Sequence, residues 1–195
     1  MDSQKNAENK NTQDKNIEVE IRSFISKEKY EQLLTFFKKE GKFLYDDEQE
    51  THYFDTEQDV RIQKNKFYSK ICIKKGKVHD EARQETEIQC AKEDFDKLES
   101  LFTLLGHSPK IKWFRARSAF SWEDTTVALD FTKGYGFIIE LEKMAKENEK
   151  EQVISWLKQK MQVLKVDLTP KEEFEKRFLH YKENWKMLLS QDVIQ

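Results

Sequence analysis

Carboxylate side chains recur at alternate positions near both ends of this 195-residue chain. Glu18 and Glu20 are separated by one apolar residue, and so are Glu140 and Glu142. In a β-strand, residues two apart point to the same face, so each pair places two carboxylates about 7 Å apart. Such carboxylates repel each other, and a hard divalent cation such as Mg²⁺ or Mn²⁺ removes that cost because these ions prefer oxygen ligands. The spacing therefore predicts acidic strand faces suited to a divalent cation.

Basic side chains alternate with other residues in the same way. They are Arg22, Arg61, Lys70, Lys74, Arg83, Arg115 and Arg117, and Gln63, Cys72, Glu85, Glu87 and Asp130 share the same faces. Arginine and lysine hold phosphate oxygens, arginine through a planar fork of donors. A charged strand face is most often a solvated face with cross-strand ion pairs. The recurrence over six or more strands weighs against that reading. Closing the sheet into a barrel would turn the charged face into a lumen, and an eight-stranded barrel has room for one small ligand.

Eight extended segments have the composition and alternation of strands. They cover residues 17–24, 43–54, 61–63, 68–75, 83–88, 111–122, 125–131 and 137–144. Amphipathic helical patterns follow the first and the fifth segment, and two more follow the last. Hairpins outnumber crossovers, which favours an antiparallel sheet covered by helices. We therefore expect an α+β fold: eight antiparallel strands with one polar face, helices packed outside and a helical C-terminal tail.

The start of the last helix has an explicit signal. Thr169 is a favoured N-cap residue, Pro170 suits the first helical position, and Glu172 completes a capping box. The sequence thus predicts that this helix begins at Pro170.

Charge is abundant but balanced. Charged residues make up 37% of the chain, while 35 basic and 37 acidic residues leave a net charge of -2. Proteins that coat nucleic acid or membrane carry a basic excess, so neither partner is expected, and no apolar run is long enough to span a membrane. Cys72 and Cys90 form no close pair, which is typical of free thiols in a reducing cytoplasm. We expect 1–16 to be a disordered tail, 17–189 a single domain and 190–195 a tail.

A series of short motifs occurs in an order that resembles one known family. They are Glu18-Val19-Glu20-Ile21-Arg22, Tyr53-Phe54-Asp55-Thr56, Arg61 with Gln63, Ile71-Cys72-Ile73-Lys74 before Gly76, Arg83 with Glu85 and Glu87, Arg115 with Arg117, Leu129-Asp130, and Gly136-Phe137-Ile138-Ile139-Glu140-Leu141-Glu142. The first is similar to the Glu-x-Glu-x-Lys signature of the CYTH superfamily, the triphosphate tunnel metalloenzymes. The resemblance covers about Glu18 to Glu142 and the helical tail.

That resemblance implies that the strands form an eight-stranded antiparallel β-barrel, a tunnel with a polar lumen, in which acidic residues bind Mg²⁺ or Mn²⁺ and basic residues bind a triphosphate. By position, the metal ligands would be Glu18, Glu20, Asp130, Glu140 and Glu142, the substrate-binding residues Arg22, Arg61, Gln63, Lys74, Arg83, Arg115 and Arg117, and the supporting residues Glu85 and Glu87. Lys74 and Tyr53 match a lysine–tyrosine pair that activates water in thiamine-triphosphatase-like relatives. A lysine acts as a base only when its pKa is depressed, which neighbouring cations in a tunnel would achieve.

Two positions depart from the family pattern. Arg22 replaces the usual lysine and Gln63 the second arginine, so one positive charge is kept and one is lost. Phosphoryl transfer needs alignment and charge neutralisation more than covalent help. We therefore expect metal-dependent hydrolysis of inorganic tripolyphosphate, or of an organic triphosphate such as thiamine triphosphate or a nucleotide, by a monomer or homodimer. The alternatives are a class IV adenylyl cyclase that forms cyclic AMP from ATP, and a non-catalytic polyphosphate or nucleotide binder.

Overall fold

The structure is a computed structural model that describes residues 16–74 and 85–190. Residues 1–15 and 191–195 lie outside the described residues, and so does Arg83. The expectations for the two tails and for Arg83 therefore concern parts of the chain that the structure does not describe. Within the described ranges every predicted strand and helix is present, with boundaries shifted by a few residues.

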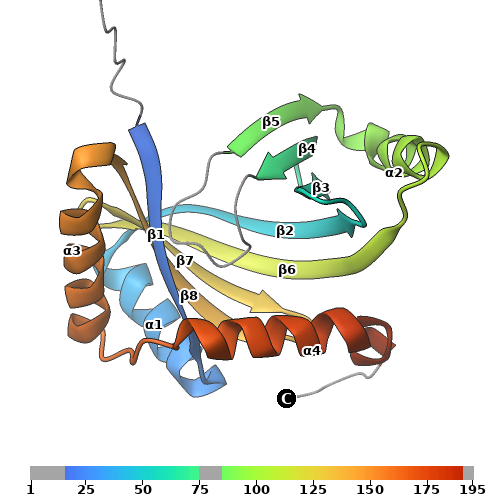
Figure 1. The fold of residues 1–195 in the computed structure, drawn as a ribbon. Coiled ribbons are helices and arrows are strands. Elements are labelled where there is room, and N and C mark those ends of the chain that lie inside the picture. The colour runs from blue at the N-terminus through green and yellow to red at the C-terminus, as the bar shows by residue number, and fades with distance from the viewer. Residues whose placement is uncertain (1–15, 75–84, 191–195) are drawn as a thin grey trace, which may run out of the picture.

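Eight antiparallel strands form one strongly curled sheet, as Figure 1 shows. They are β1 (Asn16–Ile25), β2 (Lys42–Phe54), β3 (Asp59–Lys64), β4 (Ser69–Lys74), β5 (Glu85–Cys90), β6 (Pro109–Trp122), β7 (Thr125–Thr132) and β8 (Gly136–Lys146). Their order across the sheet is β1-β8-β7-β6-β2-β3-β4-β5, so β1 and β5 form its two edges. All neighbouring strands pair antiparallel. The predicted α+β class is confirmed.

In the described part of the chain, three helices cover the outer face of the sheet and the last one lies across its inner face. They are α1 (Lys27–Glu40), α2 (Phe95–Leu104), α3 (Lys150–Val163) and α4 (Lys171–Ser190), with short 3₁₀ turns η1 (Lys92–Asp94) and η2 (Glu147–Glu149) before α2 and α3. α3 packs on β1 and β8, α1 on β2, β6, β7 and β8, and α2 on β3 and β4. Figure 1 shows α1 and α3 on one side of the molecule and α2 on the other.

The strand alternation separates an apolar outer face from a polar inner face. Val19 and Leu141 of the sheet are 0% exposed and pack with Phe37 of α1 and Leu157 of α3 in the main core. A smaller core lies under α2 around Ile62. Burying a side chain of this size contributes roughly 1.5–3 kcal/mol. Because the apolar residues are held outward in this way, the charged residues between them must face inward.

A tight turn sets the register at the centre of the sheet. Glu123 and Asp124 have φ values of 44° and 61°, the left-handed conformations that a two-residue hairpin turn requires. This turn joins β6 directly to β7, and it places Arg117 opposite Asp130 on the inner face. A local backbone feature therefore fixes a charged pair that lies well away from the turn.

The segment before α4 is bonded to β1. The Thr169 hydroxyl accepts a hydrogen bond from the Phe24 amide at 3.0 Å, and the Thr169 amide donates to the Ser23 hydroxyl at 2.9 Å. The helix begins at Lys171. The predicted start at Pro170 is one residue early: the Pro170 carbonyl accepts the first helical hydrogen bond, from the Phe174 amide at 3.2 Å, so Pro170 is the N-cap, and Thr169 bonds to β1 instead.

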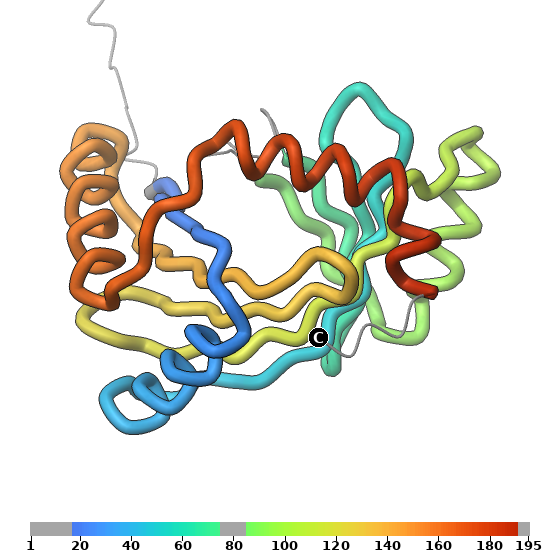
Figure 2. The backbone as a smooth tube through the Cα atoms, turned by 90° about the horizontal axis from the view of Figure 1, so that it is seen from below, coloured from blue at the N-terminus to red at the C-terminus, as the bar shows by residue number. Residues whose placement is uncertain are grey.

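α4 also lies against the β7–β8 turn. At Gly134 φ is +73°, and a Cβ atom there would lie 2.8 Å from the Cβ of Leu188, so both the backbone conformation and the close approach require glycine. The buried Tyr181 donates its hydroxyl to the Lys112 carbonyl at 3.0 Å. These contacts hold α4 alongside the sheet, where Figure 2 shows it running from the α3 side towards α2.

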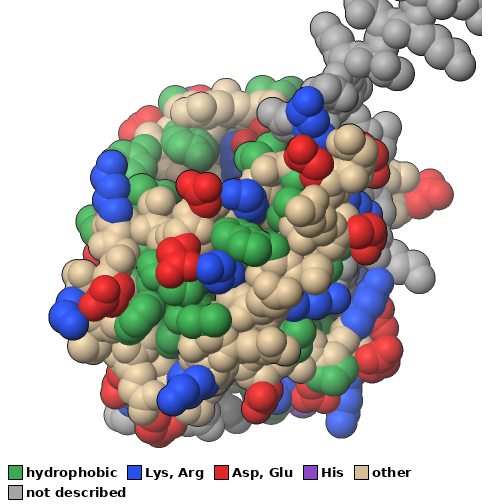
Figure 3. Space-filling view, turned by 90° about the vertical axis from the view of Figure 1, so that its left-hand side faces the viewer, with side chains coloured by type: hydrophobic (Ala, Val, Ile, Leu, Met, Phe, Trp, Pro, Cys, Tyr) green, Lys and Arg blue, Asp and Glu red, His purple; other side chains and the backbone are tan. Residues whose placement is uncertain are grey.

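The surface reflects the balanced composition. Figure 3 shows the side of the molecule on which α3 lies, where acidic and basic side chains are interspersed with small apolar patches. None of the helices in the described part of the chain is long and apolar enough to cross a membrane.

Candidate active site

The inner face of the sheet lines a cavity of about 290 Å³. All the predicted site residues that the structure describes lie in its wall: Glu18, Glu20, Arg22, Tyr53, Arg61, Gln63, Lys74, Glu85, Glu87, Arg115, Arg117, Asp130, Glu140 and Glu142. They come from all eight strands. The curled sheet therefore gathers into one cavity a set of residues that is spread over most of the sequence.

Two arginines and two carboxylates form the centre of the cavity wall. Arg117 Nε and Nη2 donate to the Asp130 carboxylate at 2.8 and 2.6 Å, and Nη2 also contacts Glu140. Arg115 Nη1 donates to Asp130 Oδ2 at 3.1 Å. Asp130 is only 1% exposed, so the two guanidinium groups provide the charge compensation that its burial requires. Burial alone raises the pKa of Glu140, but Arg117, Arg115 and Arg22 outweigh it and lower that pKa to about 2.

Three carboxylates lie together where β1 pairs with β8. Glu20 is directly opposite Glu142, and Glu18 is two residues away on the same face of β1. Arg22 lies 4.0 Å from Glu20, and within the described ranges no ion pair forms with Glu18 or Glu142. Burial, together with the charges of Glu142 and Glu20, raises the pKa of Glu18 to about 7, and burial with the charges of Glu20 and Glu140 raises the pKa of Glu142. This acidic edge is therefore short of positive charge.

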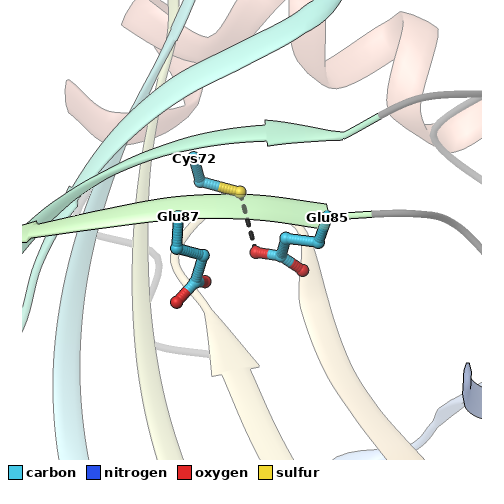
Figure 4. A group of neighbouring side chains, drawn as sticks. All are labelled: Cys72, Glu85 and Glu87. Carbon is cyan, nitrogen blue, oxygen red and sulfur yellow. Dashed lines mark hydrogen bonds between the residues drawn. The ribbon is translucent and has the colours of Figure 1, made fainter. Parts of the chain in front are cut away.

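The wall formed by β4 and β5 consists of lysine–glutamate ion pairs. Lys74 Nζ lies 2.5 Å from Glu85, and Lys70 pairs with Glu87. The Cys72 thiol donates to Glu85 at 2.8 Å, as Figure 4 shows. Ligand atoms of Cys72 and the two glutamates lie within 4.8 Å of one another, but each carboxylate already has an ammonium partner. Burial and the hydrogen bond to Glu85 raise the pKa of Cys72 to about 12, so the thiol is a poor nucleophile.

Arg61 links β2 to β3. Its guanidinium group donates to Asp59 at 3.2 and 2.6 Å and to the Tyr53 hydroxyl at 3.1 Å. Burial lowers the pKa of Arg61, but Tyr53 and Asp59 outweigh it and raise that pKa, so the side chain is charged. Tyr53 is paired opposite Arg61, whereas Lys74 is paired opposite Asp59. In the described part of the chain no hydrogen bond joins Tyr53 to Lys74, although both line the same cavity.

Aromatic rings line the cavity where α4 covers it. The ring of Trp113 lies 4.5 Å from that of Tyr135 and 6.4 Å from that of Phe178 on α4, measured between centroids. Phe174, also on α4, completes this wall, and Arg22 lies over its ring at 5.2 Å. A charged wall and an aromatic wall therefore meet in one cavity.

Sequence reasoning missed the contribution of β2. Tyr45, Gln49 and Thr51 line the cavity but were not among the predicted residues. They lie on the same strand face as Tyr53, which its motif identified, so counting back from Tyr53 in steps of two would have found them. Gln49 has the most polar contacts of the three.

The five predicted metal ligands divide into two groups. Asp130 and Glu140 are neutralised by arginines, whereas Glu18, Glu20 and Glu142 form the acidic edge. Sequence alternation could not separate these groups, because it says which face a residue is on but not which residue it meets across strands.

The fold and the charged cavity agree with a match to a known family. A family model described as the CYTH domain matches residues 16–179, which is most of the chain. The chain therefore belongs to the CYTH family, as its motifs predicted. CYTH proteins are triphosphatases and cyclases that bind triphosphates and depend on metal ions. No curated protein sequence matches the chain.

Several solved structures share the fold. The PH1819 protein of Pyrococcus horikoshii OT3 is 23% identical, with a TM-score of 0.71 over 84% of this chain and 98% of that one. A conserved hypothetical protein of Pyrococcus furiosus is 22% identical, with a TM-score of 0.67 over 77% and 91%. HpAC1 of Hippeastrum, named as an adenylyl cyclase and described as having a dominant triphosphatase activity, is 15% identical, with a TM-score of 0.64 over 85% and 96%. At these identities the likeness concerns the fold.

Proposed function

We propose that this protein hydrolyses a triphosphate with the help of a divalent cation. The observation that carries the proposal is the division of one cavity wall into an arginine-rich centre and an acidic edge that is short of positive charge. A triphosphate brings several negative charges that the arginines can neutralise, and a cation at the acidic edge balances carboxylates that repel one another. A triphosphate with a bound cation matches both parts of the wall, because it offers negative charge to the arginines and positive charge to the acidic edge.

The acidic edge fits Mg²⁺ or Mn²⁺. Hard divalent cations prefer carboxylate oxygens. Burial raises the pKa of Glu18 most, and the negative charges of Glu142 and Glu20, which a cation would compensate, raise it further. Glu18, Glu20 and Glu142 are therefore the proposed principal ligands, and Asp130 and Glu140 are ligands whose charge is shared with arginines. When bound, the cation orients the phosphate groups and stabilises charge on the transferred group.

The basic residues of the cavity are the proposed phosphate-binding groups. Arg115 and Arg117 lie on β6, which pairs with β7 and places Arg117 opposite Asp130. Their guanidinium forks suit phosphate oxygens. Arg22 and Arg61 extend this surface towards the aromatic wall. Gln63 adds no positive charge and donates its amide to another glutamine. Arg83 stays in the proposed set on the strength of its motif alone.

Lys74 and Tyr53 remain the proposed pair that activates water. Lys74 forms an ion pair with Glu85, and Arg61 donates to the Tyr53 hydroxyl. A lysine must lose its proton before it can act as a base. The proposal therefore requires that the bound cation and the neighbouring arginines offset the negative charge around the ammonium group, with Glu87 as the second supporting carboxylate of that wall.

The aromatic wall favours a second candidate function. Trp113 and Phe178 offer ring faces beside the charged wall, and a nucleotide base can stack on such rings. A class IV adenylyl cyclase would use the same cavity to form cyclic AMP and pyrophosphate from ATP.

Product analysis tests both functions. The purified protein is incubated with Mg²⁺ or Mn²⁺ and with tripolyphosphate, thiamine triphosphate or ATP, and the products are separated by chromatography. Orthophosphate release that EDTA abolishes is the expected result. Cyclic AMP with pyrophosphate from ATP would favour the cyclase. Tight binding without turnover of any substrate would refute the enzyme proposal and leave a triphosphate-binding module.

A further inference from the structure

Among the described β2 residues that line the cavity, Gln49 has the side chain with the most hydrogen bonds. Its Oε1 atom accepts hydrogen bonds from Arg115 Nε at 2.9 Å, from Arg115 Nη2 at 2.5 Å and from Gln63 Nε2 at 3.1 Å. An amide oxygen has two lone pairs, so three donors saturate it. The Gln49 oxygen is therefore fully occupied by donors of the protein itself.

A buried carboxylate determines which way the Gln49 amide points. Gln49 Nε2 donates to Asp47 Oδ2 at 2.9 Å, and Asp47 is only 5% exposed. The other oxygen of Asp47 accepts from the Lys66 amide at 3.2 Å, so the carboxylate is held by backbone. A flipped amide would aim its oxygen at the Asp47 carboxylate and its NH₂ group at Arg115, and both contacts would be repulsive. The observed orientation is therefore strongly selected.

The consequence falls on Arg115. Gln49 takes the Nε and Nη2 side of its guanidinium group, and Asp130 takes Nη1 at 3.1 Å. All three nitrogens thus have an acceptor, which defines the plane of the group. A guanidinium group has five N–H bonds, and these contacts use three of them. The remaining two leave Nη1 and Nη2 able to donate to a ligand in the cavity.

We propose that Gln49 is a positioning residue that fixes the guanidinium plane of Arg115 for binding the triphosphate. The inference rests on the proposed function and adds to it a residue that does not itself hold phosphate. The oxygen of Gln49 cannot donate to a phosphate, and Asp47 takes one of the two N–H bonds of its amide nitrogen. Its three acceptor contacts, two of them from Arg115, assign its effect on a polyanion to Arg115, and the double-mutant cycle below separates this from direct donation by the second N–H bond. Gln63 supports the arrangement from the neighbouring strand β3.

A double-mutant cycle tests this proposal. Gln49→Ala, Arg115→Ala and the double variant are compared by kcat/KM for tripolyphosphate with Mg²⁺, and by the dissociation constant for tripolyphosphate measured calorimetrically. Misplacing a positioned group costs up to about 100-fold in rate, so we expect Gln49→Ala to lower kcat/KM by about 10- to 100-fold. In the Arg115→Ala background the same change should cost less than about twofold, because the group that Gln49 orients is gone.

Two further variants make the result specific. Asp47→Asn offers one carbonyl oxygen for two donors, so it should lower kcat/KM in the same direction, and the loss should vanish in the Gln49→Ala background. Gln152→Ala removes an exposed glutamine of α3, away from the cavity wall, and is the control, with no change expected. Equal costs of Gln49→Ala with and without Arg115 would overturn the proposal, since they would mean a direct or merely structural role. A wild-type protein that neither binds nor hydrolyses tripolyphosphate would instead overturn the proposed function, and this inference with it.

Discussion

Charged residues in the cavity are stabilised by particular partners, and the partner determines what each can do. Asp130 is almost fully buried, yet it is surrounded by Arg115 and Arg117, so its negative charge is stabilised. Glu18 is also partly buried, but its nearest charged neighbours include other carboxylates. The same residue type is therefore compensated at the centre of the cavity and uncompensated at its edge. The proposed cation would therefore have the most negative charge to compensate at the edge.

The ion pairs around Asp130 can be tested by stability. Asp130→Asn removes the charge that two arginines share, and it leaves their donors with weaker acceptors. We expect the free energy of unfolding to fall by about 1–3 kcal/mol, measured by urea denaturation. Asp124→Asn is the control, since Asp124 is an exposed turn residue whose left-handed φ suits asparagine. An equal loss in both variants would contradict the assigned role of the pair.

The proposed base can be tested through its partner. Burial raises the pKa of Glu85, but hydrogen bonds from Glu87, Cys72 and Lys74 outweigh it and lower that pKa to about 2, so Glu85 is ionised in ordinary buffers. Glu85→Gln removes the negative charge beside Lys74 and so favours the neutral amine. If Lys74 is the base, the acidic limb of the kcat profile should shift to lower pH.

The expected change in kcat and the control variant for Glu85→Gln follow from the charge that the substitution removes. A shift of one pH unit would raise kcat about tenfold on the acidic limb. Glu48→Gln, at an exposed position of β2, should leave the profile unchanged. An unshifted limb in Glu85→Gln, with only the KM altered, would mean that Lys74 holds phosphate and is not the base.

At the scale of elements, α4 is the one helix that contributes side chains to the cavity wall in the described part of the chain. It is attached at its start through Thr169 to β1 and further along through Tyr181 to β6. The close approach at Gly134 adds a third contact, to the turn between β7 and β8. Because these attachments lie on different strands, the position of α4 depends on how β1, β6, β7 and β8 are arranged relative to one another.

Substitutions at two glycines distinguish the cost of a contact with α4 from the cost of backbone strain. Gly134 and Gly106 both have positive φ values, of 73° and 90°, but only Gly134 faces another side chain, that of Leu188. We expect Gly106→Ala to cost about 1 kcal/mol of strain. Gly134→Ala should cost more, because its Cβ atom would displace α4. Leu188→Gly removes the Cβ atom that the new methyl group would meet, so in the Gly134→Ala background it should recover the difference, once the helix cost of Leu188→Gly alone is subtracted, as judged by chemical denaturation. Equal costs at the two glycines would show that α4 does not press on this turn.

At the scale of the whole molecule, the acidic edge couples stability to pH and to cations. The pKa of Glu18 is about 7 in the folded protein against 4.5 for an unperturbed group. The folded protein therefore keeps a proton that the unfolded chain releases between these values, and the stability that Glu18 contributes falls as pH rises through that window. A cation that binds the ionised edge should reverse the loss.

This coupling predicts a specific pattern of melting temperatures. In EDTA, the Tm of the wild-type protein should decline as pH rises from 4.5 to about 7, and Glu18→Gln should flatten this decline. Mg²⁺ or Mn²⁺ should raise the Tm at the upper end of the window, by the equivalent of about 2.7 kcal/mol at 100 times the dissociation constant. Glu18→Gln should reduce that rise. Glu57→Gln, at an exposed position, should behave like the wild type. A cation response that survives in Glu18→Gln would argue against the proposed ligands.

The amino-acid sequence by itself determined which residues face inward. Alternation at Glu18 and Glu20, at Arg115 and Arg117, and at Glu140 required no knowledge of neighbouring strands, because side-chain direction in a strand follows from position alone. The motifs in their order likewise indicated the CYTH family before any contact was known. Burial of the intervening apolar residues then made the charged face an interior one.

The tertiary structure decided which charge meets which. Arg117 meets Asp130 because a tight turn sets the register of β6 and β7, and Glu20 meets Glu142 because β1 pairs with β8 across most of the sequence. Gln49 reaches Arg115 only because β2 lies beside β6. Charge compensation, pKa and the orientation of a guanidinium group depend on distances of a few ångströms between strands. Such distances follow from strand order and register, which a local pattern does not contain.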